Sequence, residues 1–244
     1  MAKDYFSGHS KLYATFRPTY PDALYEFIFK HVKQCDKAWD CATGNGQVAH
    51  VLAKHFKQVY ATDISSEQVK HAHQEKNIVY KVEPAEQTSF ANNQFDLITV
   101  AQAMHWLQPE GFFREVTRVV KPGAILAVWG YANCFVNSEI DKQFLHFYQH
   151  IVGPYWDKAR VLIEQQYQPI SFPFEEMPSP PFQIQVNWNL EQFAGYLTTW
   201  SATQKYIHTT GADPVPEFIR HIKPYWNKVM PVTFPVFLRL MRVK

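Results

Sequence analysis

The chain has 244 residues, of which 46% are hydrophobic and 19% charged, and its formal net charge is +2. This length allows one α/β domain with an appended lid, or at most two small domains. Because the charge is small and no basic run exceeds two residues, nucleic acid and anionic membrane surfaces are not expected partners. No apolar run approaches the roughly 20 residues needed to span a bilayer.

The cysteines and the N-terminal sequence predict the cellular setting. Cys35, Cys41 and Cys134 lack metal-site spacing and are too few for a disulfide framework, so we expect reduced thiols and no bound metal. The first 21 residues have neither an apolar core nor a small-residue cleavage site, unlike a signal peptide. We therefore expect a soluble, cytoplasmic protein, as a monomer or a homodimer.

The first half of the chain alternates between helical and strand-like patterns. Helices are predicted after Pro21 and at "QVAHVLAKHF", "SSEQVKHAHQ" (capped by Ser65) and "PEGFFREVTRVV". Five strands are predicted at "KAWDCA", "QVYATD", "NIVYKVE", "FDLITVAQ" and "AILAVWGY". Their runs of Val, Ile and Leu indicate a parallel sheet with helices on both faces.

The pattern changes beyond residue 135. Residues 137–167 are predicted to be helical, and the proline-rich "QPISFPFEEMPSPPF" is predicted to be a loop. A strand at "QIQVNWN" is followed by a helix at "LEQFAGYLTTWSATQKYI" and another at "PVPEFIRHIKPYWNKV". The last strand is predicted at "VTFPVFLRLMRVK".

The stretch "AWDCATGNGQVAHVLAKHFKQVYATD" reads as strand, glycine turn, helix, strand and terminal acid. Gly44, Gly46 and Ala49 satisfy G-x-G-x-x-G/A, and Asp63 lies near the distance expected of a ribose-binding acid. Glycines let the backbone approach a ligand, and helix-terminal N–H groups meet its negative groups. A βαβ unit with these features suits either a nicotinamide dinucleotide or S-adenosylmethionine.

Two features favour S-adenosylmethionine. Asp40 ends the first strand, six residues before Gly46. A carboxylate there would repel a pyrophosphate but suits a ligand with an ammonium group and a sulfonium. The terminal antiparallel strand expected after "QIQVNWN" also differs from the six parallel strands of a dinucleotide fold.

Five motifs in order resemble the class I S-adenosylmethionine-dependent methyltransferases: "DCATGNG", "ATD", "PAEQTSF", "FDLITVAQAMHW" and "VVKPGAILAVWGY". The resemblance covers residues 1 to about 135. "YATFRPTYP" and "TVAQAMHW" further resemble a group similar to trans-aconitate methyltransferases, which esterify small carboxylic acids. The chain departs from the family at Ala42, which replaces a glycine, and at Pro84, where many relatives carry an adenine-binding acid.

The resemblance implies a Rossmann-like, seven-stranded, mostly parallel sheet with an antiparallel terminal strand and a helical lid over the C-terminal strand ends. It implies one domain over residues 1–244, with four parts. Residues 1–36 form an N-terminal lid and first helix, and residues 37–135 the cofactor-binding core. Residues 136–182 form a helical insertion and proline-rich loop, and residues 183–244 the final strands with inserted substrate-side helices.

The resemblance also implies a set of cofactor-binding residues: Arg17, Asp40, Ala42, Gly44, Gly46, Asp63, Ile64, Ala85, Glu86, Ala101 and Gln102. Asp40 and the backbone of the glycine turn would hold the methionine moiety, and Asp63 the ribose hydroxyls. Ile64 would pack on adenine, whose edges Ala85 and Glu86 would contact. A helix-capping role for Asp63 and a solvated loop position for Glu86 are the structural alternatives.

Aromatic segments are expected to close the site. Arg17 would reach the cofactor carboxylate beneath a lid carrying Tyr5, Tyr13 and Tyr20. The alternative is that this leader only packs on the surface. The helical additions contribute Trp156, Tyr196, Trp200, Ser201 and Gln204, and we expect one or two of these to touch substrate.

Gln102 and His105 are the predicted catalytic residues, because they follow the fourth strand where the ligand crevice of an open α/β sheet lies. Gln102 would line the methyl-transfer point. His105 would orient or deprotonate an acceptor, or be a structural histidine beside the packed Trp106. A "[DN]-P-P-[YF]" motif is absent after this strand, which argues against nucleobase or glutamine-amide methylation.

The predicted function is methyl transfer from S-adenosylmethionine to a small molecule, and the resemblance to the trans-aconitate group suggests a carboxylic acid as the acceptor. A carboxylate acceptor is already a nucleophile and would require no general base. The alternatives are a non-catalytic protein that binds S-adenosylmethionine, and a nicotinamide-dependent oxidoreductase.

Overall fold

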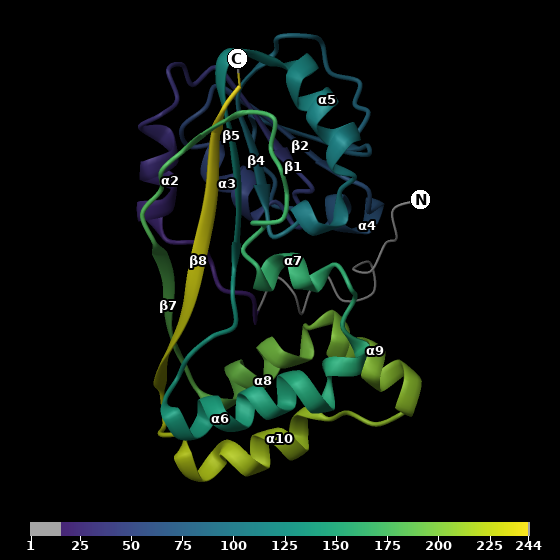
Figure 1. Cartoon of the computed structure of the whole chain (residues 1–244), viewed down its shortest axis with the longest axis vertical. Coiled ribbons are helices and arrows are strands. Elements are labelled where there is room, and N and C mark those ends of the chain that lie inside the picture. Colours follow the sequence, from purple (N-terminus) through teal and green to yellow (C-terminus); the bar gives the residue numbers. More distant parts are fainter. Residues whose placement is uncertain (1–15, 244) are drawn as a thin grey trace.

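The computed structural model describes residues 16–243 (Figure 1). Tyr5 and Tyr13, predicted to belong to a lid, lie outside the described residues. Eight strands form its sheet: β1 (Lys37–Cys41), β2 (Gln58–Asp63), β3 (Ile78–Val82), β4 (Phe95–Ala101), β5 (Val120–Tyr131), β6 (Glu175–Met177), β7 (Phe182–Trp188) and β8 (Met230–Arg242).

The sheet is mostly parallel, as predicted. Strands β1 to β5 pair in parallel in the order β3-β2-β1-β4-β5, and β8 pairs antiparallel to β5. Strands β6 and β7 both pair antiparallel to β8, so β8 alone runs against the other seven. The antiparallel terminal strand is thereby confirmed.

The described sheet has eight strands rather than the seven expected, because part of the proline-rich connector forms β6. The prolines flank this segment, at Pro173 and Pro178, and leave its own N–H groups able to pair with β8. The guanidinium of Arg239 on β8 also forms an ion pair with Glu176 of β6. The prediction that the whole connector is loop was therefore wrong at Glu175–Met177.

Helices cover both faces of the sheet, which explains its apolar strands. α2 (Asp22–Phe29) and α3 (Gln47–Leu52) pack on one face, and α5 (Pro109–Val119) and α7 (Arg160–Glu164) on the other. Neighbouring strand residues point to opposite sides, so Leu97 and Ile98 enter different hydrophobic clusters and both are fully buried. Ser65 caps the N-terminus of α4 (Ser66–Lys70), and its Oγ accepts the Gln68 N–H.

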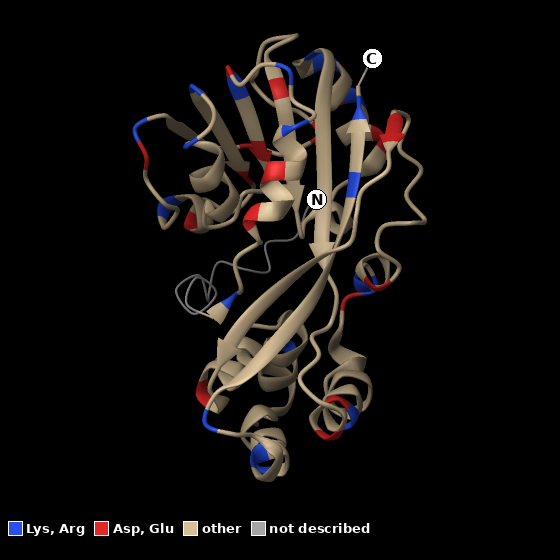
Figure 2. Cartoon of the chain, turned by 90° about the vertical axis from the view of Figure 1, so that its left-hand side faces the viewer, with Lys and Arg blue, Asp and Glu red and all other residues tan. Residues whose placement is uncertain are grey.

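A helical lobe lies beyond the ends of β7 and β8 (Figure 1). It contains α6 (Ser138–His146), α8 (Leu190–Thr198), α9 (Ser201–Thr210) and α10 (Val215–Ile222). Its buried aromatic side chains continue the hydrophobic cluster of the α2 and α3 face. In the view of Figure 2, acidic and basic residues are interspersed over the sheet half of the molecule.

The single helix predicted at "LEQFAGYLTTWSATQKYI" is two helices, α8 and α9, separated at Thr199 and Trp200. Trp200 has an extended backbone with ψ of 136°. Its side chain is 2% exposed and packs against the rings of Tyr148 and Trp156. Tertiary packing of one large ring therefore decides where the helix ends.

Within residues 16–243, none of the helices combines the length and the apolar character that crossing a membrane would require.

Candidate active site

A cavity of about 190 Å³ lies at the C-terminal ends of β1, β2 and β4, the usual position of a ligand crevice in an open α/β sheet. Most of the predicted cofactor-binding residues line it, namely Asp40, Ala42, Gly44, Asp63, Ile64, Ala85, Glu86, Ala101 and Gln102. Tyr20, predicted to belong to the lid, lines it as well.

The turn after β1 combines left-handed backbone with glycine. The φ angles of Ala42, Gly44 and Gly46 are 55°, 56° and 78°. A Cβ added at Gly44 would meet no atom within 4 Å, so this position is open. A Cβ at Gly46 would lie 2.2 Å from the Tyr80 hydroxyl oxygen. Gly46 is not among the lining residues, and its missing side chain instead leaves room for Tyr80.

Asp40 is almost fully buried at the base of this cavity, with 1% of its surface exposed. Its Oδ2 accepts hydrogen bonds from Thr43 Oγ1 at 2.5 Å and from Ala49 N at 3.1 Å, and its Oδ1 accepts one from Thr99 Oγ1 at 2.8 Å. Burial raises the pKa of Asp40 to about 6, although these hydrogen bonds oppose the shift. A cationic ligand nearby would favour its charged form.

Asp63 ends β2 and faces the turn. Its Oδ2 accepts the Gly44 N–H at 2.8 Å and its Oδ1 accepts the Ser65 N–H at 2.9 Å. The carboxylate thus supports the start of α4, which is the helix-capping role considered as the alternative for Asp63. It also lines the cavity. Next to it Ile64 is 45% exposed, an apolar surface turned partly toward the same cavity.

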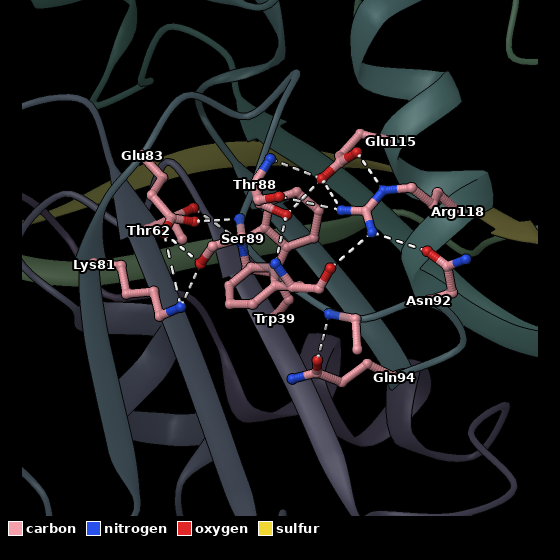
Figure 3. Close-up of polar contacts among 12 residues, drawn as sticks. Trp39, Thr62, Lys81, Glu83, Thr88, Ser89, Asn92, Gln94, Glu115 and Arg118 are labelled. Atoms are coloured by element: carbon pink, nitrogen blue, oxygen red, sulfur yellow. Dashed lines mark hydrogen bonds and ion pairs between the residues drawn. The ribbon is translucent and has the colours of Figure 1, made fainter.

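The loop after β3, which forms another wall, is held by α5 (Figure 3). Arg118 donates to Phe90 O at 2.7 Å, and Glu115 accepts the Thr88 N–H at 2.8 Å. At the start of the loop, Glu83 accepts two hydrogen bonds from Ser89. These contacts hold the loop in place, and with it the lining residues Glu83, Ala85 and Glu86.

The predicted adenine-side acid, Glu86, accepts the Gln108 N–H at 2.9 Å at the start of α5 and also lines the cavity. Ala85 beside it is buried, with 7% of its surface exposed. Glu83 lines the cavity too. Its position at the end of β3 was the sequence signal that could have identified it.

Gln102 follows β4 with a φ of 55°. Its amide is fixed on β5, because Nε2 donates to Tyr131 O and Oε1 accepts the Tyr131 N–H, both at 3.2 Å. A Cβ at Gly130 would lie 2.4 Å from Gln102 Oε1, so this packing requires glycine. Gln102 and Trp106 line both the first cavity and a second, smaller one.

The second cavity has a volume of about 50 Å³ and lies between the sheet and the helical lobe. Its lining residues are Arg17, Gln102, His105, Trp106, Trp156, Asp157, Arg160, Ile163 and Ser201. Of the five residues predicted from the helical additions, Trp156 and Ser201 line it. Tyr196 and Trp200 are instead buried in the aromatic core, and Gln204 donates to Thr198 O at 2.6 Å.

Arg17 lies in this second cavity and not among the lining residues of the first. Its guanidinium donates to the Tyr131 hydroxyl at 2.6 Å and to Thr199 O at 3.3 Å, and it lies 5.4 Å from the centre of the Tyr196 ring. The leader therefore bridges β5 and the helical lobe at this point.

His105 belongs to the 3-10 turn η1 (Met104–Trp106) and lines the second cavity. Burial, with a contribution from the positive charge of Arg160, lowers the pKa of His105 to about 3. Asp157 opposes this shift without reversing it. The imidazole is therefore neutral near pH 7, and its Nδ1 lies 3.0 Å from the Tyr167 hydroxyl oxygen.

Sequence reasoning missed Arg160 and Tyr167. Arg160 reaches the Tyr148 hydroxyl at 3.2 Å and Asn133 Oδ1 at 3.2 Å, and its guanidinium stacks 4.6 Å from the centre of the Trp156 ring. These contacts come from separate segments beyond β5, in a region without a motif, so only the tertiary structure brings them together.

The electrostatics of the first cavity fit a cation. Among the described residues that line it, Asp40, Asp63, Glu83 and Glu86 are acidic, and none is Lys, Arg or His. A pyrophosphate would face these carboxylates without a basic partner, whereas a sulfonium and an ammonium group would be attracted. The lining therefore fits S-adenosylmethionine better than a dinucleotide.

Comparisons with known proteins agree with this chemistry. A family model described as a methyltransferase domain matches residues 39–128. A Dictyostelium discoideum protein named "Putative methyltransferase" is 32% identical over 98% of this chain and 95% of its own length. The Saccharomyces cerevisiae protein named "Probable S-adenosylmethionine-dependent methyltransferase" is 30% identical over 53% of this chain and 46% of its own length.

A similar structure is that of a "Putative Type II Methyltransferase" from Anaeromyxobacter dehalogenans. It has a TM-score of 0.87 and 35% sequence identity, and the match covers 93% of this chain and 98% of that one. The similarity therefore includes the helical lobe as well as the sheet. These relationships remove the oxidoreductase alternative.

Proposed function

Because this chain belongs to the class I S-adenosylmethionine-dependent methyltransferases, and S-adenosylmethionine is its cofactor, we propose that it methylates a small molecule carrying a carboxylate. The observation that supports this proposal most directly is the second cavity. It adjoins the first cavity at Gln102 and Trp106, and its volume of about 50 Å³ suits a small acceptor group.

The second cavity offers hydrogen-bond donors and positive charge. Arg17 and Arg160 line it, and guanidinium groups bind carboxylates in a fixed, two-pronged geometry. The indole Nε1 of Trp156 is buried with no hydrogen-bond partner among the described residues. A buried donor of this kind is costly unless a ligand accepts from it. Asp157 also lines this cavity, and its negative charge offsets part of the positive charge of the two guanidinium groups. Its Oδ1 accepts the Ala159 N–H at 2.9 Å.

In the first cavity, Asp40 and the turn at Gly44 would hold the methionine end of the cofactor. Asp63 would hold the ribose hydroxyls, and Ile64 would pack on adenine. Arg17, which lines the second cavity together with Gln102, would reach across to bind the methionine carboxylate. Arg160, the first residue of α7, would then bind the acceptor.

S-adenosylmethionine supplies a methyl carbon bound to positively charged sulfur. The chain's own residues would hold the acceptor oxygen in line with this carbon and its sulfur. A carboxylate has no proton to lose, so the reaction requires alignment and exclusion of water rather than a general base. The neutral His105 and the fixed amide of Gln102 agree with such a site.

Transfer of labelled methyl groups to a panel of acceptors tests this function. We expect base-labile methyl esters from small carboxylic acids, and we expect calorimetry to show binding of S-adenosylmethionine but not of nicotinamide dinucleotides. Arg160→Gln should raise KM for the carboxylic acid without changing cofactor affinity. Methylation of only amine, thiol or phenol acceptors would contradict the proposed substrate class.

A further inference from the structure

Tyr167 is held beside His105 by contacts that involve α7, β6 and β8. It follows α7 with a φ of 58°, is fully buried and packs edge-on against the Phe237 ring at 5.2 Å. Its carbonyl oxygen accepts a hydrogen bond from Arg239 Nη1 at 2.7 Å. Because Arg239 is itself paired with Glu176, the position of Tyr167 is set by β6 and β8.

The hydrogen bond between these two side chains has a defined direction. Tyr167 is fully buried, and within residues 16–243 the only hydrogen-bond partner of its hydroxyl is His105 Nδ1, which lies 3.0 Å away. Because a buried phenol hydrogen without an acceptor is costly, we assign the hydroxyl as the donor and Nδ1 as the acceptor. The ring planes are nearly parallel, with 24° between them, which agrees with one fixed orientation.

A neutral imidazole carries a single proton, so an Nδ1 that accepts a hydrogen bond places that proton on Nε2. Burial keeps the ring neutral, the positive charge of Arg160 adds to this effect, and Asp157 opposes it. Arg17 lines the same cavity. His105 is therefore a hydrogen-bond donor in this cavity and lacks the free lone pair that a base would use.

We propose that Tyr167 is a positioning residue that fixes His105 in its Nε2–H form, so that His105 donates a hydrogen bond to the acceptor rather than removing a proton from it. This inference rests on the proposed function, since the group that accepts from His105 would be an oxygen of the carboxylate. The arrangement favours acceptors that are already anionic and disfavours those that must lose a proton in the site.

Nitrogen-15 NMR of the ring nitrogens tests this assignment without any acceptor. The chain has 11 histidines, and the signals of His105 are identified by their loss in His105→Gln. We expect the full-length wild-type protein to show a protonated Nε2 and a bare Nδ1 at His105, unchanged from pH 5 to pH 8. A protonated Nδ1, or a titration within that range, would overturn the proposal.

The variant Tyr167→Phe removes the hydroxyl while keeping the ring that packs on Phe237. We expect a mixture of the two neutral forms of His105, and a decrease of about threefold to tenfold in kcat/KM for the acceptor, the scale of one lost hydrogen bond. Affinity for S-adenosylmethionine should stay unchanged. Tyr225→Phe, at a residue that is 45% exposed, is the matched control and should alter none of these.

The two proposals can fail separately. Methylation of a non-carboxylate acceptor by a protein whose His105 is in the Nε2–H form would reject the proposed substrate but keep the positioning role. An unchanged form of His105 in a folded Tyr167→Phe protein would reject the positioning role and leave the methyl transfer unaffected. The wild-type measurement decides the matter even if that variant does not fold.

Discussion

Gly44 donates its backbone N–H to Oδ2 of Asp63 over 2.8 Å, which joins the turn after β1 to the end of β2. The other carboxylate oxygen of Asp63 accepts the Ser65 N–H. Two backbone amides therefore orient this carboxylate before a ligand binds, and such preorganisation lowers the free-energy cost of binding.

Replacing Asp63 with alanine should weaken binding of S-adenosylmethionine by about 1–3 kcal/mol, because ribose hydroxyls would lose their acceptor. Calorimetry on the folded variant measures this change. Asp213→Ala is a matched control, since Asp213 also accepts a backbone N–H at the start of a helix, that of Val215. It should lower stability without changing cofactor affinity. Equal affinities for wild type and folded Asp63→Ala would remove Asp63 from the site.

Gly46→Ala should lower the free energy of unfolding more than Gly44→Ala does. Both substitutions force alanine into left-handed backbone, which costs about 1–2 kcal/mol. Only the Cβ at residue 46 would also meet the Tyr80 hydroxyl. Urea denaturation of the two variants gives the comparison. In the Tyr80→Phe background the excess cost at residue 46 should decrease, and equal costs at both glycines would show that this contact relaxes freely.

Asp40 should make stability depend on pH. Its pKa is about 6 in the folded protein against a usual value of 3.8, so the folded state holds the proton more tightly. The stabilisation is present at low pH and is lost as pH rises from about 4 to about 6, by up to about 3 kcal/mol. Asp40→Asn does not titrate at this position. Its unfolding free energy, relative to wild type, should therefore increase over that range, and parallel pH profiles would contradict the assignment.

We expect Arg17 to bind the cofactor and Arg160 to bind the acceptor, so that their substitution affects different affinities. Arg17→Gln should weaken S-adenosylmethionine binding by about 1.5–3 kcal/mol, the scale of a hydrogen bond to a charged group. Arg160→Gln should leave that affinity unchanged. Calorimetry on both variants, with thermal unfolding as the folding control, measures the difference. The reverse pattern would exchange their assignments.

The parallel half of the fold was predictable because its signals are local. The glycine turn, the acid at the end of β2 and the apolar runs of β1, β4 and β5 each depend on a short stretch of sequence. The cap at Ser65 was equally readable. The break at Trp200 and the short strand β6 were not, because each depends on partners far away in the chain: the aromatic rings around Trp200, and the edge of β8.

The sequence by itself determined the methyltransferase family and the places of Asp40, Gly44 and Asp63 at the strand ends, since these residues lie within consecutive βαβ units. Only the tertiary structure decided that Arg17 lies beside Arg160 in a second cavity and that Tyr167 holds His105. The physical reason is that these contacts join the leader, the sheet and the helical lobe across more than 60 residues of chain. Such contacts leave no periodicity or spacing in the sequence.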